Sequence, residues 1–276
     1  MGSASKPRAR RRNLCQHQVD RVTDVVEHAS TKVQLLLDQL RDERSRRVVL
    51  VSHCLLNENT RYAGGATRAG AVAEVVEELI AAGYGIHQLP CPERLAWGGA
   101  LKRHSLRLYN SKGRPLYAVR GALLRAFIWW TKLIYRRLAR QVAKDVADYQ
   151  RSGIEVAGIV GIGASPSCGV TTTLDLRASL EVVAACPAAA LTRDVMNEEA
   201  VLACRRPGEG LFIEALDGEL KRRGMTVPAL EHDLAAELHG KRQPVLAAPP
   251  PRTLGTLAAS HPPPAQLPAI RRGKKS

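Results

Sequence analysis

Apolar residues in this sequence gather in three short runs, at 47–53, 84–90 and 154–162. The third run has no alternation of polar and apolar positions and is rich in Val and Gly, which is typical of a strand buried on both faces. Between the first two runs, apolar side chains fall on one side of a predicted helix at 67–82, and Gly83 is placed to end it. This order predicts parallel neighbouring strands joined by a right-handed crossover.

The remaining pattern predicts an α/β body with appendages. Residues 47–240 are expected to form a three-layer α/β/α sandwich with a mostly parallel sheet, which includes a further strand at 179–183 and a helix at 214–223. Residues 1–46 comprise a basic tail and an amphipathic helix, and residues 241–276 are a Pro-rich basic tail that we expect to be disordered.

The N-terminal helix carries an apolar stripe over 15–40, with alternating spacings of four and three. Such a stripe pairs two copies of a chain in a coiled coil, or docks the helix on its own domain. Because the stripe is short, docking is the favoured interpretation, and a homodimer through 15–40 is the alternative.

Each apolar run leads to a cysteine, namely Cys54, Cys91 and Cys168. Carboxyl ends of parallel strands meet at the ligand-binding edge of an α/β sheet, so we expect the three thiols to be neighbours. Three thiolates without a fourth describe a metal or cluster site with one open coordination position. Helix starts beside the thiols are expected to lower their pKa. The other cysteines have no such place and are expected to be structural: Cys15, Cys186 and Cys204.

The formal net charge of +15 is concentrated in three segments that lack acidic residues, 1–12, 102–140 and 241–276. These segments predict contact with a polyanion, either RNA or an anionic membrane, or else they serve only solubility.

A basic helical insertion is expected at about 102–150, with a helix from 116 to 150 that breaks near Gly121. The middle of this helix, 126–135, is apolar nearly all round and is edged by arginines. The pattern is typical of an interfacial helix on anionic lipid, or of a crossover helix buried between the second and third strands. No segment approaches the ~20 apolar residues of a membrane span, and no secretory signal is found, so a cytoplasmic protein is expected.

Three motifs carry a resemblance to a known family. They are Cys-Leu-Leu from Cys54, Cys-Pro-Glu from Cys91, and Ser-Pro-Ser-Cys-Gly from Ser165. In this order they resemble the 2-thiouracil desulfidase family, over roughly 48–168 and more faintly beyond. The chain departs from the family pattern at Thr60 and Ala63, where cysteine and aspartate are usual, and at 100–104, which replaces a Pro-rich stretch.

The resemblance implies that Cys54, Cys91 and Cys168 hold a [4Fe–4S] cluster whose fourth iron binds the sulfur of a substrate thiocarbonyl. It implies Glu93 as the carboxylate that takes a proton from the attacking water, and Ser165 as the serine that orients substrate or transfers a proton. The activity is then a non-redox removal of sulfur from a small thiolated heterocycle, which yields the carbonyl compound and sulfide. Thiolated RNA is the alternative substrate, because the basic segments would hold it.

Two other classes of function stay open on the residues alone. The three cysteines can hold zinc, or Cys168 can act as the nucleophile of a hydrolase. The chain can also be a non-enzymatic adaptor that binds nucleic acid or membrane through its basic segments. Near the site, His53 and His87 are expected to be hydrogen-bonded core histidines, whereas Glu58 and Arg61 either contact substrate or lie in a solvated loop.

Overall fold

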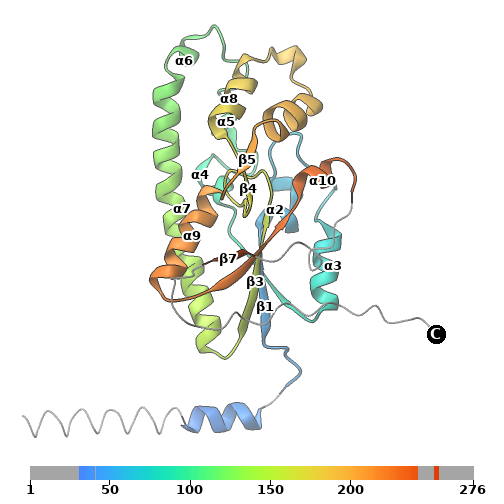
Figure 1. Cartoon of the computed structure of the whole chain (residues 1–276), viewed down its shortest axis with the longest axis vertical. Coiled ribbons are helices and arrows are strands. Elements are labelled where there is room, and N and C mark those ends of the chain that lie inside the picture. The colour runs from blue at the N-terminus through green and yellow to red at the C-terminus, as the bar shows by residue number, and fades with distance from the viewer. Residues whose placement is uncertain (1–30, 41, 242–251, 255–276) are drawn as a thin grey trace, which may run out of the picture. The chain divides into compact units, whose positions relative to one another are not determined.

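The computed structural model describes residues 31–40, 42–241 and 252–254, and the chain divides into two compact units, Met1–Arg44 and Ser45–Ser276 (Figure 1). In the first unit, residues 31–39 are helical, and their side chains are exposed. The earlier part of the predicted stripe, with Cys15, lies outside the described residues. The homodimer through 15–40 therefore stays a prediction.

The second unit is an α/β body built on a sheet with the strand order β2-β1-β3-β6-β7. The strands are β1 (Arg47–Val51), β2 (Gly85–Gln88), β3 (Glu155–Ile162), β6 (Val227–His232) and β7 (Arg252–Leu254), and a separate antiparallel pair is formed by β4 (Thr172–Leu174) and β5 (Arg205–Pro207). The first four strands in the order are parallel and β7 is antiparallel. The mostly parallel sheet expected from the apolar runs is confirmed.

Helices cover the sheet and the loops beyond its carboxyl edge. They are α2 (His53–Leu56), α3 (Ala73–Ala81), α4 (Pro92–Ala96), α5 (Arg103–Leu106), α6 (Pro115–Ala118), α7 (Arg120–Arg151), α8 (Leu176–Ala185), α9 (Leu211–Arg222) and α10 (Leu234–Leu238), with 3-10 turns at Glu58–Thr60 and Ala188–Ala190 and a π-helix at Val195–Leu202. Figure 1 shows α7 and α9 side by side on one face of the sheet and α3 on the other. These are the three layers of the predicted sandwich.

The core lies between the sheet and these helices. Leu50 of β1, Ile159 of β3 and Tyr135 of α7 have no exposed surface, and they pack in one cluster with the apolar residues of α3 and α9. Burial of apolar surface, at roughly 25 cal/mol per Å², is the main favourable term that holds the strands in this register. No described helix is long and apolar enough to cross a bilayer.

The strand predicted at 179–183 is wrong, because these residues lie in α8. The pair Val182-Val183 favours a strand locally, but Asp175 caps a helix instead by accepting hydrogen bonds from the backbone N–H groups of Arg177 and Ala178. Val183 then buries its side chain in a small second core with Met196 and Ala200. Tertiary burial thus overrides the local preference.

The structure also places two helix boundaries at residues other than those predicted from the sequence. The helix expected from residue 67 begins at Ala73, because the backbone N–H groups of Thr67 and Arg68 donate to the buried carboxylate of Glu58. The break expected near Gly121 falls at Val119, between α6 and α7. Of the tail 241–276, the structure describes Lys241 and the short strand β7, which pairs with β6.

Candidate functional site

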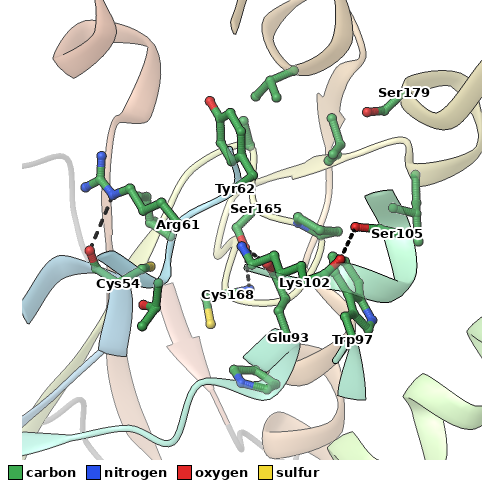
Figure 2. Close-up of a pocket in the computed structure, with 18 of the residues that line it drawn as sticks. Cys54, Arg61, Tyr62, Glu93, Trp97, Lys102, Ser105, Ser165, Cys168 and Ser179 are labelled. Carbon is green, nitrogen blue, oxygen red and sulfur yellow. Dashed lines mark hydrogen bonds and ion pairs between the residues drawn. The ribbon is translucent and has the colours of Figure 1, made fainter. Parts of the chain in front are cut away.

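The loops after β2, β1 and β3 carry the three predicted cysteines to one place. Cys54 lies in α2, Cys91 caps the start of α4, and Cys168 lies on the loop between β3 and β4. Because the three strands are neighbours in the sheet, these loops meet at its carboxyl edge. All three cysteines line the same pocket, which is shown in Figure 2.

The pocket also contains the two other residues singled out from the sequence. Glu93 and Ser165 lie on its wall with the cysteines, whereas Cys186 and Cys204 do not line it. The space, including its open mouth, is about 920 Å³. Most of the remaining wall is apolar or aromatic and comes from several elements: Tyr62, Trp97, Tyr109, Leu180, Met196 and Val201. A flat organic molecule with few polar groups fits such a lining.

The three thiols are held in their protonated form by burial. Removal from water raises the pKa of the Cys54 thiol to about 12, and it raises the pKa values of Cys91 and Cys168 as well. The helix starts were expected to lower these pKa values, and this expectation is wrong. α2 and α4 are very short, and Cys168 lies in a loop, so desolvation dominates.

Glu93 is fixed on the pocket wall through both of its carboxylate oxygens. The hydroxyl of Ser167 donates to Oε1 over 2.9 Å, and Lys102 forms an ion pair with Oε2. Figure 2 shows the side chains of Lys102 and Glu93 directed toward one another. Burial alone would lower the pKa of Lys102, but the charge of Glu93 and its hydrogen bond raise it, so Lys102 stays a cation.

Ser167 links Glu93 to the core. Its Oγ lies 2.7 Å from the hydroxyl of Tyr135, a fully buried residue of α7. Ser165 has a different role, because its Oγ accepts hydrogen bonds from the backbone N–H groups of Ser167 and Cys168, over 3.2 and 3.0 Å. Ser165 therefore shapes the turn that presents Cys168, and its hydroxyl hydrogen stays available for a ligand.

Glu231, at the end of β6, holds the loop that follows Cys168. Its carboxylate accepts hydrogen bonds from the backbone N–H groups of Val170, Thr171 and Thr172, over 2.7 to 3.0 Å, and from the hydroxyls of both threonines. Hydrogen bonds to a charged acceptor are stronger than those between neutral groups. Glu231 is thus a positioning residue for Cys168, and no pattern in the sequence pointed to it.

The start of α9 closes against the same loop. Backbone N–H groups of Leu211 and Phe212 donate to the carbonyls of Pro166 and Ser167, over 2.9 and 3.1 Å. The approach is possible only because residue 210 is glycine, since a Cβ there would lie 2.4 Å from the carbonyl carbon and oxygen of Ser167. The helix therefore serves as a rigid support for the turn around Cys168.

A buried ion network lies behind Cys54. Arg61 pairs with Glu237 and Glu58, and its Nε donates to the carbonyl oxygen of Cys54 over 3.3 Å. Glu237 also bonds His232 Nε2 over 2.6 Å. Arg61 lines the pocket, but its guanidinium is committed to this network, and Glu58 is fully buried, so the solvated loop considered for both residues is wrong.

The two histidines near the strand ends differ in place. His87 does not line the pocket, and its Nδ1 lies 3.1 Å from the Tyr149 hydroxyl, as expected for a core histidine. His53 lines the pocket, and its Nδ1 bonds Gln88. Within the described part of the chain, the buried Nε2 of His53 has no hydrogen-bond partner. A polar ligand in the pocket would supply one.

The cysteines converge, but the described residues contain no group of three His, Cys, Asp or Glu side chains arranged around a single metal ion. A lone zinc requires every sulfur at ~2.3 Å from one point. An iron–sulfur cluster has a different requirement, because each thiolate binds a different iron of the cluster. The donor set of three thiols on separate rigid loops fits the larger group.

Comparison with known proteins gives one similarity. An uncharacterized protein of Methanocaldococcus jannaschii is 27% identical to the chain over 127 residues, which is 46% of this chain and 70% of that protein. No protein-family profile matches the chain, and no solved structure matches it significantly. The fold and the pocket therefore carry the functional argument.

Proposed function

We propose that this protein is an iron–sulfur-dependent, non-redox desulfidase that removes sulfur from a thiocarbonyl heterocycle. One observation carries the proposal, namely the convergence of Cys54, Cys91 and Cys168 with Glu93 in a single, largely apolar pocket. Three thiolate ligands leave one coordination position for a substrate, and a carboxylate beside that position supplies a base. The sequence resemblance to 2-thiouracil desulfidases supports the same chemistry.

When bound by the three thiolates, a [4Fe–4S] cluster would supply an open iron that acts as a Lewis acid toward the thiocarbonyl sulfur. Glu93 takes a proton from the water that attacks the thiocarbonyl carbon. The carbon–oxygen bond forms, the carbon–sulfur bond breaks, and sulfur leaves as hydrogen sulfide with the two protons of the water. No electron is transferred between substrate and protein.

The residues around Glu93 support its role as base. Lys102 and Ser167 hold the two carboxylate oxygens, so the group loses little freedom when the water arrives. The aromatic side chains of Tyr62, Trp97 and Tyr109 on the pocket wall suit a flat heterocycle. Ser165, which accepts two backbone hydrogen bonds, has one hydrogen left to donate to the substrate.

The alternatives are weaker on this geometry. A nucleophilic cysteine needs a lowered pKa, whereas burial raises that of Cys168. Zinc needs a tighter grouping than the described side chains offer. A non-enzymatic adaptor that uses only the basic segments would not account for the pocket or for the buried Lys102–Glu93 ion pair. A reducing compartment such as the cytoplasm, which we propose as the site of action, keeps the thiols free.

The proposal is tested by anaerobic reconstitution with iron and sulfide, followed by metal analysis and an assay with 2-thiouracil. We expect brown protein with about four iron and four sulfide per chain, and conversion of 2-thiouracil to uracil with release of sulfide. Replacing Cys54, Cys91 or Cys168 by Ser should abolish iron binding. Cys186→Ser is the matched control and should retain both iron and turnover.

Metal analysis tests the proposed cofactor, and the turnover assay tests the proposed substrate independently of it. Loaded protein without turnover of 2-thiouracil, 4-thiouridine or a thiolated RNA would overturn the desulfidase activity. Colourless protein that binds neither iron nor sulfide would overturn the cluster. Faster turnover of thiolated RNA than of the free base would make RNA the substrate.

A further inference from the structure

The long helix α7 presents an apolar stripe on its outward side. Leu123, Ala126, Trp130 and Leu133 follow one another at spacings of three and four, which places them along one face of α7, and Val119 lies just before the start of this helix. Trp129 lies beside this stripe and is 68% exposed, and Trp130 is 47% exposed. Large exposed aromatic side chains in a continuous apolar patch are typical of an interaction surface.

The opposite side of α7 is anchored in the body. Thr131 accepts a hydrogen bond from the indole of Trp97 over 3.0 Å, and Tyr135 is fully buried. Figure 1 shows α7 at the outer edge of the α/β unit, with α9 beside its lower half. α7 is therefore a crossover helix that packs on the body with one side and leaves its other side exposed. The apolar stripe is already helical and faces solvent before any partner binds.

Positive charge surrounds the apolar stripe. Residues 102–140 contain eleven Lys and Arg and no acidic residue. Among the described residues, no salt bridge is recorded for four basic side chains of α7 that flank the two tryptophans in sequence: Arg125, Lys132, Arg136 and Arg137. Lys132 and Arg136 line a shallow groove beside α9 that also contains Glu214. An ordinary solubilising face would carry both signs of charge interspersed. This face, which we call the α7 face, combines the apolar residues named above with these four cations.

We propose that the α7 face docks the protein on an anionic lipid surface. Indole side chains prefer the boundary between headgroups and acyl chains, and neighbouring Arg and Lys pair with lipid phosphates. RNA would use the arginines and the indoles, but it offers no partner for Val119, Leu123 and Leu133. A second copy of the same helix would bring like charges together, so the charge disfavours self-association.

Co-sedimentation of the full chain with vesicles tests the proposal. We expect binding to phosphatidylcholine vesicles that contain phosphatidylserine and much weaker binding to pure phosphatidylcholine. The double variant W129S/W130S should bind at least about tenfold less, although its charge is unchanged. The double variant R136Q/R137Q should bind about 30-fold less, because each cation near an anionic surface contributes roughly fivefold.

A matched control removes apolar surface elsewhere. Ile80 on α3 is 62% exposed, and Ile80→Ser should leave vesicle binding unchanged. Circular dichroism and melting temperatures should match wild type for all variants. Wild-type vesicle binding by W129S/W130S would overturn the proposal, since the basic tails alone would then explain it. Binding of a single-stranded RNA that depends on both tryptophans, without vesicle binding, would overturn it in favour of RNA.

Discussion

The hydroxyl of Ser167 donates a hydrogen bond to Oε1 of Glu93 over 2.9 Å, although Glu93 lies in α4 after β2 and Ser167 lies on the loop after β3. Ser167 is in turn held by the buried hydroxyl of Tyr135. Hydrogen bonds therefore run without a gap from Tyr135 in the core through Ser167 to Glu93 on the pocket wall, and they hold the carboxylate that we assign as the base.

Removal of this base should separate catalysis from cofactor binding. Glu93→Gln keeps the size of the side chain but cannot accept the proton, so we expect turnover of 2-thiouracil to fall by about 10² to 10⁴. Ser167→Ala should reduce turnover about tenfold, because Glu93 is then held only by Lys102. Iron and sulfide content should not change in either variant. Ser179→Ala, elsewhere on the pocket wall, is the control, and wild-type turnover by Glu93→Gln would contradict the assignment.

The carboxylate of Glu231 should matter for the loop rather than for chemistry. Glu231→Gln replaces one accepting oxygen by a donor that faces backbone N–H groups, so we expect a loss of about 2–4 kcal/mol in the free energy of unfolding. Iron retention should fall with it, because the loop carries Cys168. Urea unfolding and iron analysis on the same sample check both. A variant as stable as wild type would show that the loop is held by other contacts.

Two glycines of the α9 region provide an internal comparison. Gly210→Ala would place Cβ 2.4 Å from backbone atoms of Ser167, so we expect destabilisation by about 2–4 kcal/mol and poor iron binding. Gly218 lies within α9 and has no atom within 4 Å of the same position. Gly218→Ala should therefore stabilise the protein by about 0.5–1 kcal/mol. Equal effects of the two changes in thermal unfolding would refute this account.

Acid should remove the stability that the buried ion network contributes to the fold. Burial alone would raise the pKa of Glu237, but hydrogen bonds from His232 and Arg61 and the charge of Arg61 lower it strongly. A lowered pKa contributes stability that is present above the unfolded value of 4.5 and is lost as the pH falls below it. Glu237→Gln should cost about 3–5 kcal/mol at neutral pH. Its stability should also vary less than that of wild type below pH 4.5 in urea titrations.

The site thiols should be unreactive in the metal-free protein. Because burial raises the pKa of Cys54 to about 12, iodoacetamide at neutral pH should modify Cys186, which is only half-buried, well before Cys54 or Cys168. The folded protein holds these thiol protons more tightly than the unfolded chain, whose thiols titrate near 9.0. The metal-free protein should therefore lose stability as the pH rises above that value. Mass spectrometry of peptides identifies the modified cysteine, and rapid labelling of Cys168 would revive the nucleophile hypothesis.

The convergence of the cysteines was predictable because it follows from topology. Once three apolar runs are parallel neighbours, the residues just after them must share one edge of the sheet. The partners of Glu93 were not predictable in this way. Lys102 reaches Glu93 from an irregular segment in which its own backbone is left-handed, with φ of 51°. Glu231 lies near the end of β6, and the short apolar pattern of this strand does not indicate that a carboxylate there binds the loop after Cys168.

The sign of the thiol pKa shifts was missed for a related reason. A sequence shows that a thiol stands near a helix start, but it does not show how short the helix is or how far the thiol is removed from water. In the folded protein, removal from water has the larger effect on the thiol pKa values of Cys54, Cys91 and Cys168, and it raises them. Local patterns thus brought the three cysteines to attention, whereas the electrostatics of their thiols depend on packing.

The separation of the three cysteines along the chain dictates an order of assembly. A metal-binding motif with its ligands in adjacent positions can capture a metal while the polypeptide is still unstructured. Here the three cysteines meet only after β1, β2 and β3 have paired, so insertion of the cluster that we propose would have to follow formation of the sheet. On this proposal the cluster-free protein has to persist as a folded acceptor, and the hydrogen bonds that hold the loop around Cys168 would stabilise it until the cluster is inserted.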